Sequence, residues 1–402
     1  MLTKVQGPQG ITVHLLSQID AQIDSKPIAE QPSLPAIEAQ ANEVADLFVG
    51  FVQSAAATLD ICIYDFRLDL SDVSDKIVTA INGAAERGVA VRVAYDAKQT
   101  DDEVIIKQFR GAGGDPAPIG TRAFLARSLH APVQIKAIAE VTVHDEVTAE
   151  PINPSSHIMH QKYMVADAAT EAAAVWMGST NFTVDAWALQ ENNIVTVASP
   201  DLAGQYTKDF DDLWTTGKLT GTGQGNTGTV TVGPADVRYA FAPGEGSTIE
   251  SLIAQTIAGA TRRLRVASMV TSSPAILTAL KDQLDAGIDF KGVYDKDETL
   301  DVLKQWQKSA TGADKVALLQ AVIAKMVAKN SLPFTATGAH NFMHDKVVVA
   351  DDTLVTGSFN FSANAAHNAE NVIALTDTGL ADAYADYIDQ LAARYAAVSA
   401  RR

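Results

Sequence analysis

The chain has 402 residues, of which 47% are hydrophobic and 20% charged, and a formal net charge of −17. This length exceeds the size at which one hydrophobic core usually keeps growing, so we expect two domains or one duplicated domain. The composition excludes a disordered or fibrous chain, and the acidic balance argues against a general nucleic-acid-binding surface, which needs Lys and Arg to neutralise phosphates.

The first hundred residues predict a βαβ unit. We expect a helix from Pro35 to about Ala57 and then a strand in "TLDICIYDF". A second helix is expected over "SDKIVTAINGAAERG", with Ser74 or Asp75 as its N-cap and Gly88 at its end, followed by a strand in "VAVRVAYD". Because a helix joins the two strands, we expect them to be parallel. Cys62, the single cysteine, lies in the first of these strands and is expected to be buried rather than reactive.

The same order of elements returns in the second half of the chain. It reads as a helix in "TIESLIAQTIAGA", a strand in "RRLRVASMVT", a helix in "SPAILTALKDQLDAG" and a strand in "IDFKGVYD". The segments "RGVAVRVAYDAKQ" and "AGIDFKGVYDKDE" match in their Gly, in their alternation of apolar residues and in the closing Tyr-Asp. We therefore interpret the chain as an internal duplication.

The predicted boundaries follow from this repeat. We expect an N-terminal extension (1–35), a first repeat (36–215), a Gly/Thr-rich surface connection (216–234) with one short edge strand, and a second repeat (235–402). Each repeat contains an insertion, at 98–156 and at 296–340. Apolar residues at helical spacing between 303 and 326 favour a packed helix in the second insertion over a lid for a lipid-like substrate.

Nothing in the sequence indicates export or membrane insertion. The N-terminal segment lacks an apolar run followed by a small-residue cleavage site, and no stretch approaches the roughly 18 uninterrupted apolar residues of a membrane span. We expect a cytoplasmic protein or, alternatively, the mature form of a secreted one.

Each repeat carries the motif H-x-K-x-x-x-x-D around an apolar run that predicts a buried strand. The copies are His160, Lys162 and Asp167 in "HQKYMVAD", and His344, Lys346 and Asp351 in "HDKVVVAD". Matching residues follow each copy: Gly178, Ser179, Asn181 and Glu191 after the first, and Gly357, Ser358, Asn360 and Glu370 after the second. Packing alone does not demand these polar identities, so we interpret the two sets as two halves of one site.

The chemistry of this combined set suits a phosphodiester. If the halves pack about a pseudo-twofold axis, the lysines, serines and asparagines form a cage of hydrogen-bond donors around the non-bridging oxygens of a phosphate. One neutral histidine can then attack phosphorus while the other, protonated, donates to the leaving alcohol and later takes a proton from water or an acceptor alcohol. Glu191 and Glu370 are the expected partners that orient the other nitrogen of each ring.

We expect neither a metal nor another cofactor, because the lysines supply the positive charge. The pairs His157 with His160 and His340 with His344 are spaced like helical metal ligands. However, no Cys pair or H-E-x-x-H motif accompanies them.

The doubled motif, followed each time by G-S-x-N, resembles the phospholipase D superfamily over about residues 36–400. The resemblance implies an α/β fold, namely a duplicated phospholipase D-like α/β/α sandwich with two pseudo-twofold-related βαβ domains and one active site at their interface. It also implies a two-step mechanism through phosphohistidine, with His160 as the nucleophile and His344 as the general acid and base. Asp167, Asp351 and the two motif glycines would be structural. The first copy departs from the second in one respect, a longer connection between its Asp and its Gly.

We therefore expect a phosphodiester hydrolase that removes, and in part transfers, the head group of phospholipids, with transient contact to a membrane surface and no obligate protein partner. The alternatives within this chemistry are a metal-independent nuclease, which the net charge disfavours, and a phosphatidyl transferase. A non-catalytic anion-binding module is a third alternative, which the two intact motifs disfavour.

Overall fold

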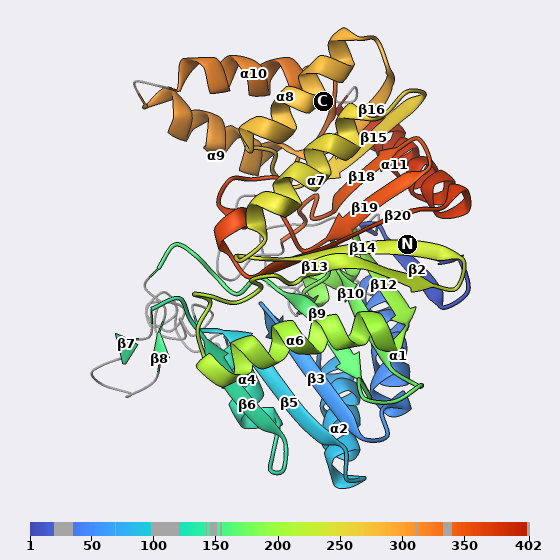
Figure 1. The fold of residues 1–402 in the computed structure, drawn as a ribbon, viewed down its shortest axis with the longest axis vertical. Helices are drawn as coiled ribbons and strands as arrows, with labels where there is room; N and C mark the ends of the chain where they lie inside the picture. The colour runs from blue at the N-terminus through green and yellow to red at the C-terminus, as the bar shows by residue number, and fades with distance from the viewer. Residues whose placement is uncertain are drawn as a thin grey trace.

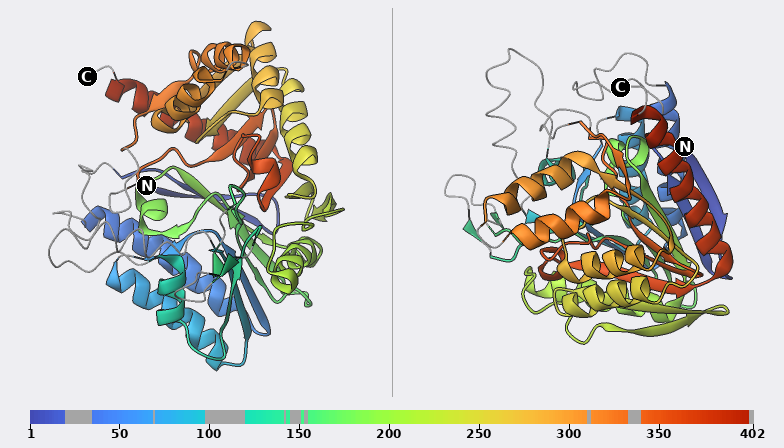
Figure 2. Two further views of the ribbon diagram at one scale, coloured as in Figure 1. Left: turned by 90° about the vertical axis from the view of Figure 1, so that its left-hand side faces the viewer. Right: turned by 90° about the horizontal axis from the view of Figure 1, so that it is seen from above.

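The chain forms two large mixed sheets of eight strands each, one in each half of the sequence, in a computed structural model (Figure 1). The structure describes residues 1–19, 35–68, 70–97, 120–141, 143–144, 151–152, 155–309, 312–332 and 340–399. The half coloured blue to green is stacked against the half coloured yellow to red (Figure 2). None of the described helices combines the length and the apolar character needed to cross a bilayer.

Within the described residues, the first half contains the large sheet, two short two-stranded sheets and five helices. The strands are β1 (Leu2–Gln6), β2 (Ile11–Leu16), β3 (Thr58–Ile63), β4 (Phe66–Arg67), β5 (Ala90–Asp96), β6 (Gln134–Ile138), β7 (Val143–His144), β8 (Pro151–Ile152), β9 (Lys162–Ala166), β10 (Ala174–Gly178), β11 (Phe182–Thr183) and β12 (Asn192–Ala198). The helices are α1 (Pro35–Ser54), α2 (Ser71–Glu86), α4 (Thr121–Ser128), α5 (Val184–Ala188) and α6 (Pro200–Thr216).

The second half repeats this plan. Its strands are β13 (Thr227–Val232), β14 (Ala235–Ala242), β15 (Arg263–Ser268), β16 (Asp289–Asp295), β17 (Val327–Lys329), β18 (Lys346–Ala350), β19 (Thr353–Gly357) and β20 (Glu370–Thr376). Its helices are α7 (Gly246–Ala258), α8 (Pro274–Asp285), α9 (Lys296–Gln307), α10 (Ala313–Ile323), the short 3-10 helix η3 (Ala365–His367) and α11 (Thr378–Ser399).

The order of strands confirms the duplication. The first sheet runs β1-β2-β12-β10-β9-β3-β5-β6 and the second runs β13-β14-β20-β19-β18-β15-β16-β17, so each strand has a counterpart at the same place. As expected for βαβ units, β3 pairs in parallel with β5, and β15 with β16. Both motif strands, β9 and β18, lie antiparallel beside these units.

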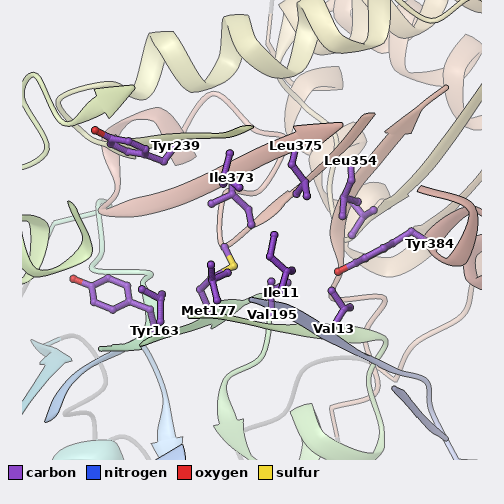
Figure 3. Close-up of a cluster of buried hydrophobic side chains, with 14 of the residues drawn as sticks. Ile11, Val13, Tyr163, Met177, Val195, Tyr239, Leu354, Ile373, Leu375 and Tyr384 are labelled. Carbon is purple, nitrogen blue, oxygen red and sulfur yellow. The ribbon is translucent and has the colours of Figure 1, made fainter. Parts of the chain in front are cut away.

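The two sheets enclose one shared apolar core. Alternate residues of β2 and β20 face it, including Ile11, Val13 and Ile373, because successive side chains of a strand point to opposite faces (Figure 3). Helices α6 and α11 contribute to this same core. The opposite face of the first sheet packs on α1 and α2, and that of the second on α7 and α8. Because both repeats bury their inner faces against each other, the residues at the strand ends are held in a fixed relation.

Some predicted details differ from the structure. Helix α2 begins at Ser71 with Leu70 as its N-cap, so the prediction of Ser74 or Asp75 was wrong. Val73 is already buried, and the apolar face of the helix therefore starts before the predicted cap. Cys62 is buried, as expected. The apolar residues of the second insertion lie on α9, α10 and the turn after α10, where they pack against the core of the second half, which agrees with the packed-helix interpretation. Much of the first insertion lies outside the described residues.

The predicted domain boundaries remain a prediction, but the structure shows strands in the predicted N-terminal extension and in the predicted connection between the repeats. Within the segment predicted as an N-terminal extension, β1 and β2 form one edge of the first sheet. Their counterparts are β13, inside the predicted connection, and β14. Helix α11 runs beside the N-terminal strands (Figure 2), and Tyr387 on it donates a hydrogen bond to the carbonyl of Leu16 at 2.6 Å. The duplicated unit thus includes an N-terminal hairpin in each half.

Candidate active site

The two motif histidines lie two positions before the first residues of the central strands β9 and β18. The residue before each histidine is fixed by a buried aspartate at the end of β5 or β16, one strand beyond the immediate neighbour of the motif strand. The carboxylate of Asp96 accepts the backbone N–H of Met159 at 2.5 Å, and that of Asp295 accepts the backbone N–H of Met343 at 2.9 Å. These aspartates close the matching Tyr-Asp segments of the two repeats. Sequence reasoning noticed that match but assigned it no role.

Each histidine is also bonded through its backbone to the other repeat. The N–H of His160 donates to the carbonyl of Ala369 at 2.9 Å, and the N–H of His344 donates to the carbonyl of Glu191 at 3.1 Å. Parallel bridges between Met159 and Ala369 and between Glu191 and Met343 continue this pairing. The two repeats therefore position each other's histidines.

Both histidines line one cavity of about 260 Å³ between the repeats. Its other lining residues include Asn181 and Asn360 from the predicted phosphate-binding set. The amide oxygens of these two asparagines have no hydrogen-bond partner in the described part of the chain. An unpaired buried amide oxygen is costly, and its occurrence at two matching positions sets these asparagines apart from the other residues of the cavity wall. The remaining wall consists of Tyr64, Asp65, Arg67, Thr183, Asp185, Gln190, Met269, Glu298, His340 and Phe342.

The motif lysines lie beneath this cavity and are almost completely buried. Lys162 donates to the carbonyl of His160 at 2.7 Å, and Lys346 donates to the carbonyl of His344 at 2.5 Å. Burial lowers the pKa of both ammonium groups, that of Lys346 to about 7. Burial also lowers the pKa of both imidazoles well below its ordinary value, and the two lysine charges lower it further. In the free site, both histidines are therefore favoured in their neutral form beside the positive lysines. An anionic ligand in the cavity would stabilise those lysine charges.

The side-chain partner of His160 is the predicted one. Its Nδ1 lies 2.9 Å from both carboxylate oxygens of Glu370, which comes from the other repeat. Asn368 donates to the same carboxylate at 3.2 Å. Burial raises the pKa of Glu370 to about 8, against the opposing effect of Lys162. This pairing orients the ring and leaves its Nε2 for a substrate.

The partner of His344 differs from the predicted one. Its Nδ1 lies 2.9 Å from Oδ1 of Asn192, and Glu191 does not contact the ring within hydrogen-bonding distance. Instead the Glu191 carboxylate is fully buried and pairs with Lys329, while Tyr395 and the backbone N–H of Gln18 also donate to it. The proposed orienting role for Glu191 is thus contradicted by its contacts.

The error was one of register. The N–H of Ser179 donates to the carbonyl of Asn193, and the N–H of Ser358 donates to the carbonyl of Asn371, so these two asparagines are equivalent. The residue before Asn371 is Glu370, and the residue before Asn193 is Asn192. Glu191 therefore corresponds to Ala369, whose carbonyl likewise accepts a bond from a histidine N–H.

The predicted serines lie behind the cavity rather than on its lining. The Ser179 hydroxyl donates to Oδ1 of Asn192 at 2.7 Å, and it accepts the N–H of Asn193 at 3.0 Å. The Ser358 hydroxyl accepts the N–H of Asn371 at 3.0 Å and hydrogen-bonds with the Glu370 carboxylate. These contacts connect the serines to the partners of the histidines, whereas their predicted binding of phosphate remains a prediction.

The motif aspartates lie at the far ends of the strands, where they bind backbone. Asp167 has φ of 52° and accepts the N–H groups of residues 56, 57 and 58 at 2.7–3.0 Å. Asp351 has φ of 54° and accepts those of residues 261, 262 and 263 at 2.7–3.0 Å. A Cβ on Gly178 or Gly357 would collide with the carbonyl oxygen of Asn193 or Asn371. These four residues hold backbone geometry around the site.

The additional histidines pair with carboxylates. Nδ1 of His157 lies 2.9 Å from Glu140, and Nδ1 of His340 lies 3.5 Å from Asp185. No group of three or more His, Cys, Asp or Glu with the geometry to hold a metal ion occurs among the residues that the structure describes.

Comparison with known proteins identifies the family of this chain. A family model described as "Cardiolipin synthase, PLD-like domain" matches residues 49–214 and 253–392. Among curated proteins, the chain is 26% identical over 168 residues to a mitochondrial cardiolipin hydrolase from Chlamydomonas reinhardtii. That match covers 42% of this chain and 56% of the relative, so the chain spans little more than half the length of the curated protein it matches.

One solved structure shows a similar fold over most of the chain, and a second matches part of it. The phosphatidylserine synthase of Haemophilus influenzae Rd KW20 is 11% identical with a TM-score of 0.56, over 94% of this chain and 87% of that one. Nuc, a phospholipase D family member from Salmonella typhimurium, is 25% identical with a TM-score of 0.31, over 40% of this chain and 95% of that one.

Proposed function

The chain belongs to the phospholipase D-like family, and from this premise we propose that it is a phosphodiesterase that cleaves the head group from a phospholipid through a phosphohistidine intermediate. The observation that carries the proposal is the pair of histidines in one cavity, each with Nδ1 bonded to an acceptor from a matching strand and with a buried lysine beneath it. This arrangement leaves two Nε2 atoms to act on one phosphorus.

In the first step, Nε2 of His160 attacks phosphorus and the bond to the leaving alcohol breaks. Protonated His344 donates its proton to the departing oxygen. In the second step, His344 accepts a proton from water or an alcohol, whose oxygen attacks phosphorus and releases His160. Lys162, Lys346 and the amides of Asn181 and Asn360 stabilise the non-bridging oxygens in both steps.

The substrate anion also resolves the protonation problem of the free site. Burial and the two lysines keep both imidazoles neutral, yet the first step requires one protonated ring. A bound phosphodiester brings negative charge beside these groups, which favours their protonated forms. Binding of substrate would therefore charge His344 while His160, in contact with phosphorus, acts as the nucleophile.

Two observations support a lipid over a nucleic acid. The family description and the printed name of the curated relative both refer to cardiolipin, a phospholipid. The net charge of −17 disfavours a polyanionic chain as substrate. A cavity of about 260 Å³ accommodates a phosphate with a small alcohol and leaves acyl chains outside.

The test is product analysis by mass spectrometry in the presence of a chelator. The protein is incubated with phosphatidylcholine plus ethanol, with cardiolipin vesicles, and with single-stranded DNA, and the variants His160→Asn and His344→Asn serve as controls. Phosphatidate with phosphatidylethanol, absent in both variants, would support a phospholipase D that works through an intermediate. Cleaved DNA with intact lipids would instead identify a nuclease. Turnover by either variant at the wild-type rate would refute the two-histidine mechanism.

A further inference from the structure

The two repeats supply chemically different partners to their histidines at matching positions. His160 contacts the carboxylate of Glu370, whereas His344 contacts the amide of Asn192. Both partners are completely buried and stand directly before the equivalent residues Asn371 and Asn193. The backbone is thus symmetric around the site, but the charge is not.

The surroundings of Asn192 suit an amide. Its Nδ2 donates to the carbonyl of Ala186 at 3.0 Å and to Oε1 of Gln190 at 3.2 Å. These two acceptors fix the side-chain orientation and turn Oδ1 toward His344, where Ser179 also donates to it. A carboxylate in this position would place an oxygen against two acceptor oxygens. The site therefore disfavours Asp at 192.

The surroundings of Glu370 suit a carboxylate. Asn368 donates its side-chain N–H to Oε1 at 3.2 Å, the Ser358 hydroxyl bonds with the same group, and Lys162 contributes a nearby positive charge. No acceptor comparable to the Ala186 carbonyl faces this carboxylate among the contacts that the described residues make. The difference between the two positions is consequently built into their neighbours.

We propose that Asn192 is a positioning residue that holds His344 in its Nδ1–H tautomer and supplies no negative charge to it. The histidine that transfers protons is therefore the one without a carboxylate partner. This inference rests on the proposed phosphodiesterase function. An amide oxygen can only accept, so Nδ1 of His344 must carry a proton and Nε2 is left to exchange one with the leaving alcohol or water. The imidazolium of His344 gives up its proton more readily than one beside a carboxylate.

The opposite requirement holds for His160. A bond between Nε2 and phosphorus places positive charge on the ring. That charge lowers the pKa of Glu370, which burial raises to about 8 in the free site, and the ionised carboxylate then stabilises the ring through Nδ1–H. The asymmetry therefore favours covalent chemistry at His160 and proton transfer at His344, independently of the family resemblance.

The charges around His344 set the expected pH dependence. Lys346 and Lys162 face it from β18 and β9, and His160 lies across the cavity. The carboxylates of Asp185 on α5 and Glu298 on α9 line the cavity wall. Asn192→Asp would add a negative charge in direct contact with the ring and so favour the protonated form of His344. Since kcat/KM requires protonated His344 in the first step, its alkaline limb should move upward by about one pH unit.

The experiment combines a pH profile with NMR. Wild type, Asn192→Asp and Asn192→Leu are compared by kcat/KM against pH on a soluble phosphodiester, and the histidine ring nitrogens of the intact 402-residue chain are observed by 15N NMR. Expected results are an Nδ1–H tautomer for neutral His344 in the wild type, an upward shift of the alkaline limb in Asn192→Asp, and a mixed tautomer with at least tenfold lower kcat in Asn192→Leu. An Nε2–H tautomer in the wild type, or an unchanged pH limb in a folded Asn192→Asp, would overturn the proposal.

The NMR measurement separates this inference from the proposed function, because it requires no turnover. An Nδ1–H tautomer in a protein that cleaves no phosphodiester would support the role of Asn192 in orienting His344 and refute the proposed reaction alone. Glu370→Gln is the matched variant in the other repeat. It should reduce kcat more strongly than Asn192→Leu, because it removes the charge that stabilises the covalent step, and a smaller loss would contradict the assignment of roles.

Discussion

Replacing Glu191 with Gln should destabilise the protein by about 3 kcal/mol while leaving the chemistry of the folded enzyme nearly intact. Glu191 and Lys329 are 0% and 1% exposed and form an ion pair between the two repeats. In the variant, the Lys329 ammonium would lose its carboxylate partner and keep the carbonyls of Phe342 at 3.0 Å and Leu189 at 3.5 Å. Removing one partner of a buried pair typically costs about 3–5 kcal/mol, and the lower end applies because Gln retains an acceptor.

The measurement is urea unfolding followed by circular dichroism, together with kcat under conditions in which each variant is folded. Adding Lys329→Met to Glu191→Gln should recover part of the loss, because the uncompensated charge is then removed. Lys304→Ala provides the control, since its pair with Asp301 is exposed and its loss should leave the unfolding free energy nearly unchanged.

The comparison with Glu370→Gln decides whether the corrected register is right. Glu370 contacts the ring of His160, the proposed nucleophile, so its replacement should lower kcat on the order of 10²-fold or more. A loss of kcat in Glu191→Gln as large as in Glu370→Gln, with unchanged unfolding free energy, would return Glu191 to the catalytic set and refute the structural assignment.

Three further predictions concern the surroundings of the site. Burial alone would raise the pKa of Asp351, but three backbone N–H groups outweigh it and lower the pKa from 3.8 to about 2. Asp351→Asn should therefore cost about 2 kcal/mol of unfolding free energy at pH 7, and this cost should vanish as the pH falls from about 4 to about 2; an equal cost in acid would contradict it. Because burial lowers the pKa of Lys346 to about 7, this lysine should lose its charge as the pH is raised above neutral, so that KM for the phosphodiester increases with a smaller effect on kcat. A KM that does not change with pH would exclude binding of the phosphate by charged Lys346. Gly357→Ala should destabilise by about 1–3 kcal/mol because its Cβ meets the Asn371 carbonyl, whereas Gly50→Ala, which has open space on α1, should be neutral or stabilising in the same unfolding assay.

The sequence was sufficient for the duplication and for the pairing of the two motifs, because these depend on patterns that recur in both halves. The His-Lys-Asp spacing is identical in the two copies, and the apolar run inside each copy predicted buried β9 and β18. The apolar strands also show why the two sheets pack: their residues are hydrophobic on both faces and require a cover on each.

The partner of His344 could not be predicted in the same way, because it depends on a connection that differs between the repeats. Glu191 and Glu370 lie at the same distance in sequence after Gly178 and Gly357. In the first repeat, however, helix α5 lies between the Gly-Ser segment and β12, whereas the second repeat has only the short η3 before β20. The connection in the first repeat is one residue longer, so two glutamates at equal distances from the glycines occupy different positions in the structure. The tandem asparagines of "ENN" were the only sign of this shift.

The two histidines have different side-chain partners, but the contacts behind those partners are symmetric. Asn193 donates to Asp345 of the second repeat at 2.8 Å, and Asn371 donates to Gln161 of the first repeat at 2.5 Å. Each asparagine thus binds the residue between His and Lys in the opposite motif, and the apolar core beside them fixes the same relation (Figure 3). Because these contacts hold the backbone of both motifs in matching positions, the side chains of each half can differ without moving a histidine.

In the proposed reaction, those differences would decide which histidine attacks and which transfers the proton, a choice that a symmetric site could not make. With identical partners, either histidine would attack phosphorus and either would donate the proton, and substrate could bind productively in two orientations. The structure instead places Glu370 beside one ring and Asn192 beside the other, with Tyr64 next to His160 at 4.9 Å between ring centroids. Met269 follows β15, as Tyr64 follows the equivalent strand β3, and it lines the same cavity. The leaving alcohol should therefore lie toward the His344 side, and the orientation of the phosphodiester follows from side chains that the duplicated backbone leaves free to vary.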